Sequence, residues 1–168
     1  RQRAMIAMAL ACDPEVLIAD EPTTALDVTI QAQIMDLLEE LQEDLAMSIL
    51  LITHNLGLVA SLADHVAVMY SAHVVEYAST KELFANPLHP YTHGLLSSVP
   101  VLVMSKEKEL RVIPGAVPNP LRPPVGCRFH PRCPVATDRC AREEPVLHEH
   151  SPGHLAACHL IEEGKSPL

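Results

Sequence analysis

The chain has 168 residues, 12 of them basic and 21 acidic, and a formal net charge of −9. An acidic chain with no Trp, two Phe and three Tyr lacks both the positive charge and the aromatic platforms of a nucleic-acid-binding protein, so no nucleic-acid partner is expected. Its 48% of hydrophobic residues can build a core, which excludes disorder throughout, and no run of 18 apolar residues is present to cross a bilayer.

The first predicted elements alternate between helix and strand. Residues 2–11 are helical in composition and are stopped by Asp13-Pro14. The apolar run 16–19 is flanked by turn residues, which predicts a strand buried on both faces of a parallel sheet. Asp27 is a suitable N-cap for a long helix, because apolar residues follow it at helical spacing as far as Leu45.

The pattern continues with a second buried strand, a short helix and a hairpin. The strand covers residues 48–53, and the helix covers residues 56–63. Two β-rich runs, 66–70 and 74–77, flank a tight turn at Ser71-Ala72 and predict the hairpin. This alternation predicts a layered α/β domain over residues 1–86, with a sheet that is too small to be complete.

The second part of the chain, residues 87–168, has a different composition. It contains 13 of the 15 prolines and four of the five cysteines, which predicts loop-rich structure with short helices. Pro90 suits the first turn of a helix that runs to about Ser98. Prolines exclude a helix over residues 112–125, where we expect an extended connector. The change in composition places a domain boundary near Asn86-Pro87.

Two adjacent carboxylates, Asp20 and Glu21, follow the first predicted strand. Ligands of open α/β sheets bind at the carboxyl ends of the strands. One carboxylate there can hold Mg²⁺ through water, and its neighbour can orient an attacking water molecule. Alone, the pair is also consistent with exposed acids on a loop.

The order of motifs around this pair resembles the second half of an ABC-transporter ATPase domain. Asp20-Glu21 matches the Walker B acids, Ala25-Leu26-Asp27 the D-loop, His54 the switch histidine, and Arg1-Gln2-Arg3 the tail of the signature segment. The resemblance implies that Asp20 helps to hold Mg²⁺, that Glu21 is the general base, and that His54 contacts the γ-phosphate. It also implies that Asp27 lies at the interface between two nucleotide-binding domains.

The chain departs from this family at several positions. No G-x-x-x-x-G-K-[ST] loop is present, so residues 1–168 should bind ATP poorly and hydrolyse it at no useful rate on their own. The first residue is Arg1, and we expect the chain to be a piece of a longer protein, cut just after the Leu-Ser-Gly-Gly signature. Asn55 stands where Asp is usual. Ala72 and Ala78 occupy positions that commonly carry Gly, where a positive φ is expected.

Residues 82–92 resemble the start of the C-terminal extension of oligopeptide and dipeptide importer ATPases, a subfamily that includes nickel importers. The implied fold is the C-terminal part of a P-loop ABC ATPase domain followed by a loop-rich extension. The implied function is ATP hydrolysis that drives peptide import, with ATP and Mg²⁺ at the site. The implied partners are a second ABC ATPase subunit, transmembrane permease subunits and, indirectly, a solute-binding protein. The implied location is peripheral, on the cytoplasmic face of the cell membrane.

Four cysteines in the second part suggest a metal site: Cys127, Cys133, Cys140 and Cys158. Disulfides do not suit a reducing cytosol, and structural zinc usually shows a tighter cysteine pair than any present here. Widely spaced cysteines next to proline suit a [4Fe–4S] cluster. Zn²⁺ and unliganded thiols remain as alternatives, and the subfamily resemblance implies the iron–sulfur cluster. A rival hypothesis for the whole chain is a non-catalytic remnant that serves as a structural or regulatory metal-binding module.

Overall fold

The computed structural model describes residues 2–98, 112–119 and 121–165. The chain forms two compact units, residues 1–62 and residues 63–168. The change in composition at Asn86-Pro87 therefore falls inside the second unit. A domain boundary at that point stays a prediction.

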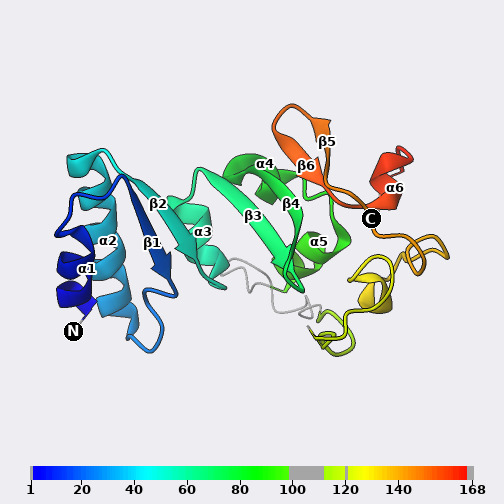
Figure 1. Ribbon diagram of the computed structural model, residues 1–168, viewed down its shortest axis with the longest axis horizontal. Helices are drawn as coiled ribbons and strands as arrows, with labels where there is room; N and C mark the ends of the chain where they lie inside the picture. The colour runs from blue at the N-terminus through cyan, green and yellow to red at the C-terminus, as the bar shows by residue number, and fades with distance from the viewer. Residues whose placement is uncertain (1, 99–111, 120, 166–168) are drawn as a thin grey trace, which may run out of the picture. The chain divides into compact units, whose positions relative to one another are not determined.

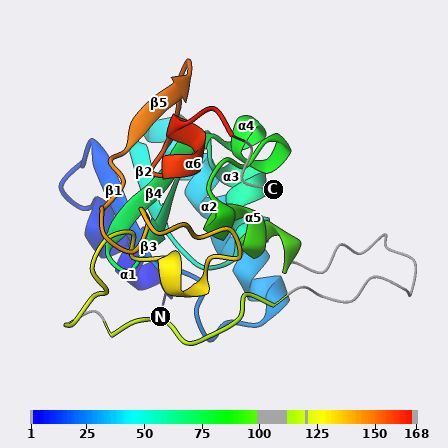
Figure 2. The ribbon, with the colours of Figure 1, turned by 90° about the vertical axis from the view of Figure 1, so that its right-hand side faces the viewer.

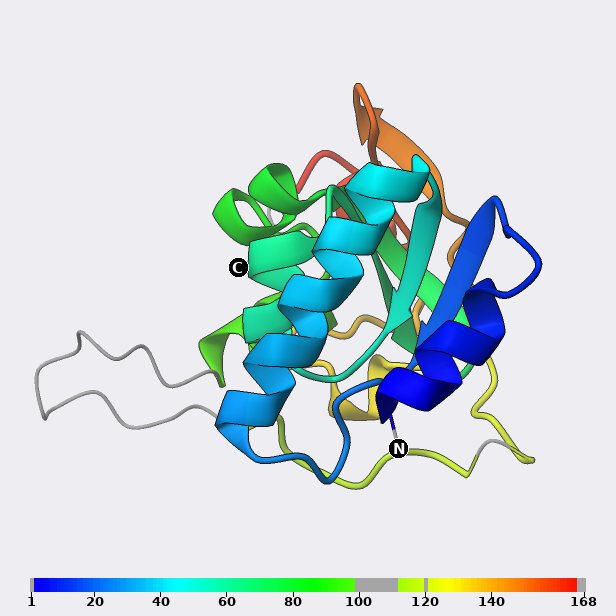
Figure 3. The same ribbon diagram turned by 90° about the vertical axis from the view of Figure 1, so that its left-hand side faces the viewer.

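The first unit contains the expected alternation of helices and strands. Its elements in chain order are α1 (Gln2–Leu10), β1 (Val16–Asp20), α2 (Val28–Leu45), β2 (Ser48–Ile52) and α3 (Leu56–Leu62). Strands β1 and β2 pair in parallel, with Asp20 opposite Ile52. Helices α1 and α2 lie side by side on one face of these strands (Figure 1, Figure 3). The helix and strand predictions for residues 2–62 are confirmed.

Burial in β1 differs from the expectation. Leu17 and Ala19 are buried, whereas Val16 and Ile18 are 56% and 64% exposed. Side chains of a strand point alternately to its two faces, and helices α1 and α2 cover only one of them. The core on the covered face is aliphatic and is built from Leu17, Ile34, Met35, Leu38 and Met47.

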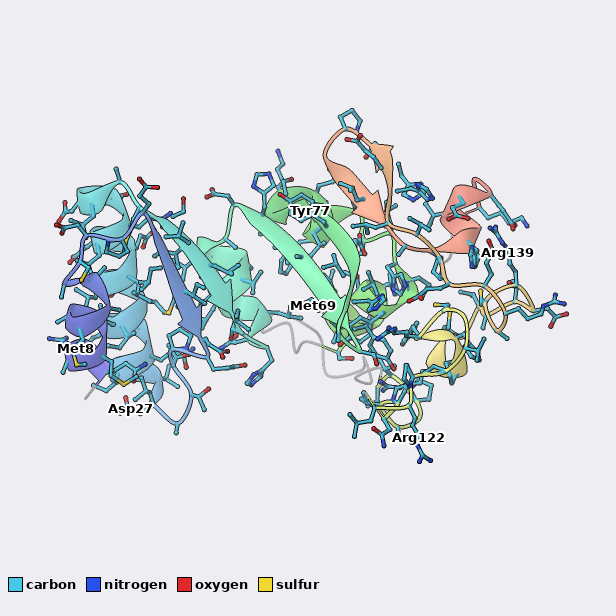
Figure 4. All side chains as sticks on the ribbon, viewed as in Figure 1. Met8, Asp27, Met69, Tyr77, Arg122 and Arg139 are labelled. Atoms are coloured by element: carbon cyan, nitrogen blue, oxygen red, sulfur yellow. The ribbon has the colours of Figure 1, made fainter. Side chains whose placement is uncertain are left out.

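Helix α2 begins and ends with identifiable caps. The Asp27 carboxylate accepts a hydrogen bond of 2.9 Å from the Ile30 N–H, so the predicted N-cap is confirmed. The helix ends at Leu45, and its C-cap residue Ala46 has a φ of 50°, in the left-handed region. Figure 4 labels Asp27 at the end of α2 where the helix begins.

The second unit is organised around a four-stranded antiparallel sheet in the order β3-β4-β6-β5. Strands β3 (His65–Tyr70) and β4 (His73–Ser79) form the predicted hairpin, and β5 (His148–Ser151) and β6 (His154–Ala156) form a second one. Figure 2 shows β5 at the top of the view, and α5 lies below it.

Short helices complete this second unit. They are α4 (Thr80–Ala85), α5 (Pro90–Ser97), a single 3₁₀ turn over His130–Arg132, and α6 (His159–Glu162). The helix predicted from Pro90 is confirmed. The described part of residues 112–125 contains neither helix nor strand, as expected for an extended connector. Residue 120 and residues 99–111 lie outside the described residues.

The tight turn between β3 and β4 was predicted partly correctly. Ser71 and Ala72 have φ angles of 47° and 65°, so the expected positive φ at Ala72 is confirmed. The same expectation for Ala78 is wrong. Ala78 is a fully buried residue of β4, and its methyl group packs in the core of the unit, where no left-handed conformation is needed.

A β-bulge in the β3–β4 hairpin places a carboxylate in the core. Val68 pairs with Glu76, but Met69 pairs with Val74, which leaves Val75 as the extra residue. Val75 and Glu76 are consequently both buried, although they are neighbours in one strand. Glu76 is fully buried and accepts hydrogen bonds from the Leu88 and His89 N–H groups at 2.7 and 2.9 Å. His154 Nε2 lies 2.8 Å from the same carboxylate.

Candidate functional site

The acid pair and His54 meet at the carboxyl ends of the two parallel strands. Asp20 is the last residue of β1, and His54 lies two residues after the end of β2. The Glu21 N–H donates to the Ile52 carbonyl at 2.8 Å, which joins the two strand ends. His54 Nδ1 lies 2.7 Å from Glu21 Oε1. The structure therefore brings together two of the side chains that the sequence singled out.

Both oxygens of the Glu21 carboxylate have a partner. Oε1 contacts His54, and Oε2 accepts a 3.0 Å hydrogen bond from the Thr24 hydroxyl. The hydrogen bond from His54 is the main cause that holds the pKa of Glu21 below its ordinary value, with a further contribution from Thr24. Glu21 is therefore ionised at neutral pH. Sequence reasoning missed Thr24, although its place three residues after Glu21 is a signal that could have found it.

The contact with Glu21 places one proton on the His54 ring. A carboxylate only accepts hydrogen bonds, so Nδ1 carries a proton. The His54 side chain is 86% exposed, and in the described part of the chain Nε2 has no partner. This ring nitrogen is therefore open to a ligand.

The two other predicted residues have different surroundings. The Asp20 side chain is exposed at the end of β1 and makes no hydrogen bond within the described residues. Asp27 is exposed at the start of α2, where one carboxylate oxygen is used as the helix cap. The Gln2 amide holds the intervening loop by donating to the Pro22 carbonyl at 2.8 Å.

The four cysteines of the second unit line one cavity. Cys127, Cys133, Cys140 and Cys158 contribute to its wall, together with His89 and other residues. The Cys127 N–H donates to the Cys140 carbonyl at 2.8 Å. Gly126 allows this approach, because a Cβ built at its position would lie 2.4 Å from that carbonyl oxygen. The four cysteines that the sequence singled out therefore line the same cavity, and their role as metal ligands stays a prediction.

Polar contacts hold the segments that carry these cysteines. His159 is buried, and its Nε2 lies 2.9 Å from the Glu143 carbonyl. Arg139, labelled in Figure 4, forms ion pairs with Glu143 at 2.8 Å and with Glu162 at 3.2 Å. These contacts connect the segment around Cys140 to helix α6, which begins directly after Cys158.

The surroundings of Cys127, Cys133 and Cys158 favour the neutral form of these three thiols. Burial raises the pKa of Cys127 and of Cys158, and it raises the pKa of Cys133 to about 11. The neighbouring thiols add to each shift, whereas backbone N–H groups that donate to the sulfur atoms oppose it. Only a bound cation could keep several of these thiols ionised together.

The five cysteines of the chain are free thiols. Within the described residues, no three side chains of His, Cys, Asp or Glu converge closely enough to hold one metal ion. The arrangement therefore does not form the tight tetrahedron that zinc requires.

Comparison with known proteins identifies relatives for almost the whole chain. Residues 75–140 match a family described as the oligopeptide/dipeptide transporter, C-terminal region. The oligopeptide transport ATP-binding protein AppD of Bacillus subtilis is 55% identical over 163 residues, which are 97% of this chain and 49% of the relative. OppD of Salmonella typhimurium, another oligopeptide transport ATP-binding protein, is 54% identical over 94% of this chain and 47% of the relative. The dipeptide transport ATP-binding protein DppD of Escherichia coli is 53% identical over 99% of this chain and 51% of the relative.

The chain spans about half the length of these relatives. Among the residues that the structure describes, no helix is both long and apolar enough to cross a membrane. The similarity covers the strand-end site of the first unit and the cysteine cavity of the second.

Proposed function

We propose that this chain, which belongs to the family of ATP-binding proteins of oligopeptide and dipeptide transporters, supplies the catalytic carboxylate and switch histidine of an ATPase that drives peptide import. The observation that carries the proposal is the 2.7 Å contact between His54 Nδ1 and Glu21 Oε1 at the ends of two parallel strands. ATP is the proposed substrate, and Mg²⁺ is its proposed counter-ion.

Each residue of the strand-end site has a chemical role in this proposal. Asp20 contributes a carboxylate that holds Mg²⁺ through water. Glu21 orients the attacking water molecule and accepts its proton as the oxygen bonds to the γ-phosphorus. The bond to ADP then breaks, and its electron pair remains on the β-phosphate oxygen. Before substrate binds, His54 Nδ1–H holds the Glu21 carboxylate, and in the presence of ATP the ring turns so that this N–H donates to a γ-phosphate oxygen instead.

The lowered pKa of Glu21 has two opposing consequences. The hydrogen bond from His54 keeps the carboxylate ionised, so it is ready to accept a proton at neutral pH. The same bond makes the carboxylate a weaker base. Movement of His54 toward a phosphate would release this bond and strengthen Glu21 as a base when substrate is present.

The partner subunits of the proposed transporter are inferred from the family to which the chain belongs. Asp27 lies next to a second ABC ATPase subunit, and transmembrane permease subunits hold the pair at the cytoplasmic face of the membrane. A solute-binding protein delivers the peptide. Residues 1–168 contain no G-x-x-x-x-G-K-[ST] motif, so on their own they should show no useful hydrolysis.

Replacement of Glu21 by Gln tests the catalytic role. In an ATPase in which these residues follow a phosphate loop, Glu21→Gln should lower steady-state hydrolysis by about 10²–10⁴-fold, because the amide cannot accept the proton. Nucleotide binding should remain. Glu43→Gln, which changes an exposed acid of α2, is the matched control and should keep full activity. Undiminished hydrolysis by the Glu21→Gln protein would exclude this residue as the base.

We further propose that the cysteine cavity holds a [4Fe–4S] cluster rather than Zn²⁺. The four cysteines line one cavity, and backbone N–H groups donate to the sulfur atoms of three of them. Bound iron would favour the thiolates and would tie together the loops of this unit. When bound, such a cluster supplies cross-linking and a one-electron couple.

The colour and metal content of the protein test this second proposal. Anaerobically prepared protein should be brown, absorb near about 400 nm and contain about four irons per chain. Cys133→Ser should lose most of the iron. Cys12→Ser is the matched control, because Cys12 lies in the first unit and is exposed. Colourless protein with one zinc would contradict the cluster.

A further inference from the structure

His89 is a buried side chain that the proposed catalytic chemistry does not use. It is 2% exposed, lies directly before α5, and contributes to the wall of the cysteine cavity. Buried polar side chains in native proteins normally have hydrogen-bond partners for their polar atoms. The hydrogen bonds of His89 therefore show which of its ring nitrogens is still unpaired.

The position of the His89 ring is fixed on several sides. Its backbone N–H donates to Glu76 Oε2 at 2.9 Å, and Glu76 is in turn held by His154. Its ring nitrogen Nδ1 accepts a 3.0 Å hydrogen bond from the Tyr91 N–H. The Phe129 ring lies beside it, with a centroid separation of 5.7 Å. The ring is therefore oriented before any ligand enters the cavity.

The bond from Tyr91 determines which nitrogen carries the proton. A backbone N–H can only donate, so Nδ1 must present its lone pair, and the proton of the neutral ring lies on Nε2. Burial lowers the pKa of His89 to about 4, so the ring is neutral at physiological pH. Nε2–H is a donor, and it has no acceptor among the residues that the structure describes.

We propose that His89 donates a hydrogen bond from Nε2–H to a sulfur atom of the group that fills the cysteine cavity, and so tunes its reduction potential. This inference rests on the proposed cluster. Four cysteine sulfur atoms line the cavity together with His89. When a cluster is bound, one of these sulfur atoms or a sulfide of the cluster could accept the hydrogen bond from Nε2–H. A hydrogen bond to a sulfur atom becomes stronger as negative charge accumulates there, which favours the reduced state.

The same geometry argues against His89 as an iron ligand. A ligating Nε2 would have to give up its proton, and a neutral ring would then carry the proton on Nδ1. Nδ1–H would face the N–H of Tyr91, so two donors would point at each other at the start of α5. His89 is therefore a positioning residue for the bound group.

Two variants of His89 separate the cavity donor from the helix cap. The oxygen of Asn can replace Nδ1 as the acceptor for Tyr91, but its short side chain cannot replace Nε2–H. The longer amide of Gln can present a donor near the position of Nε2, and it loses the cap. His93→Asn serves as the matched control. His93 is the next histidine along the chain, lies within α5 and does not line the cavity.

The experiment measures the reduction potential of the anaerobically assembled chain by redox titration of its absorbance. His89→Asn should shift the midpoint potential to a more negative value at unchanged iron content. His89→Gln and His93→Asn should keep the wild-type potential, although His89→Gln should be less stable. An unchanged potential in His89→Asn, or an equal shift in both His89 variants, would overturn the inference.

A spectroscopic measurement covers the case in which His89→Asn does not fold. With ¹⁵N-labelled histidine, electron–nuclear double resonance of the reduced wild-type protein should show a coupled nitrogen and a proton that exchanges in D₂O. His89→Gln should lose that nitrogen coupling, and a coupling that persists unchanged would count against His89. Brown wild-type protein with no effect of any variant defeats this inference alone. Wild-type protein that takes up no iron defeats the cluster proposal and this inference with it.

Discussion

The two compact units of this chain differ in what fills their cores and in where their polar groups lie. Residues 1–62 contain no Phe, Tyr or Trp and carry ten acidic side chains against two arginines. Their core is aliphatic, and the Glu21–His54 contact is largely exposed. Residues 63–168 are almost balanced in charge and contain every aromatic residue of the chain.

The second unit buries polar groups that the first unit leaves at its surface. Glu76, His89, His154 and His159 are all buried there. The Tyr70 ring makes T-shaped contacts with the rings of Tyr91 and Phe129, which are tilted against each other. A buried polar group must be paired within the unit, whereas an exposed one is hydrogen-bonded by water and can exchange that water for a ligand. The second unit therefore has a cavity whose polar side chains are already held in place. The Glu21–His54 site of the first unit is open to solvent, and its side chains find further partners only when substrate binds.

The largest expected effect concerns the aromatic core. Phe129→Ala should lower the free energy of unfolding of the second unit by about 3–5 kcal/mol, because it removes a ring that is 98% buried against Tyr70 and Tyr91. All three tyrosines lie in this unit, so tyrosine fluorescence during denaturation reports on it directly. Phe84→Ala, at a partly buried position, is the control. An equal loss in both variants would show that the ring cluster has no special weight.

The next effect depends on pH. Because the pKa of His89 is about 4 in the folded chain and 6.5 for an unperturbed histidine, its contribution to stability is complete above pH 6.5. Between pH 6.5 and 4, His89 is protonated in the unfolded chain but not in the folded chain. This difference lowers the free energy of unfolding by about 3 kcal/mol. His89→Asn should lack this part of the loss when unfolding is followed by tyrosine fluorescence at pH 7 and at pH 4. Identical pH dependence in both proteins would be inconsistent with a neutral, buried His89.

A smaller effect is expected in the first unit. Asp27→Ala should lower the stability of α2 by about 1 kcal/mol, because it removes the acceptor for the Ile30 N–H. Far-UV circular dichroism during denaturation measures the change. Asp27→Asn keeps the cap and should cost much less, and an equal cost in both variants would indicate that capping is not the role of this side chain.

The smallest expected effect concerns alanine residues with a positive φ, one in each unit. Ala46 and Ala72 have φ angles of 50° and 65°, a region that glycine occupies without steric cost. Ala46→Gly and Ala72→Gly should each raise stability by up to about 1 kcal/mol in thermal denaturation. Ala78→Gly is the control and should lower stability, since it removes a fully buried methyl group from a strand. A loss of stability in the first two variants would contradict the strain.

Much of the first unit could be predicted from its sequence because its contacts follow local patterns. Apolar spacing indicated α2, and the side-chain chemistry of Asp27 indicated its first turn. Parallel strands end at the same edge, so residues after Asp20 and Ile52 had to be neighbours. Exposure of Val16 and Ile18 could not be predicted, because it depends on what covers the second face of the sheet.

Less of the second unit could be predicted, for two physical reasons. Strand β5 has the sequence His-Glu-His-Ser, which shows no apolar alternation, and its place is set by pairing with β6. The burial of Glu76 depends on a bulge that turns two successive side chains inward. The cysteines were identified because their chemistry is distinctive. The burial of His89 was not predicted, because Glu76 and Phe129, which it contacts, are distant in sequence.

The contact between Glu76 and His154 can form only late in the synthesis of the chain. The two residues are separated by 78 positions, whereas Glu21 and His54 are separated by 33. At roughly 5–20 residues per second, the ribosome makes His154 roughly 4–16 seconds after Glu76. Until then the carboxylate can be paired only with the Leu88 and His89 N–H groups, and its contact with His154 is missing. Assembly of the cavity wall is therefore among the last events in the production of this polypeptide.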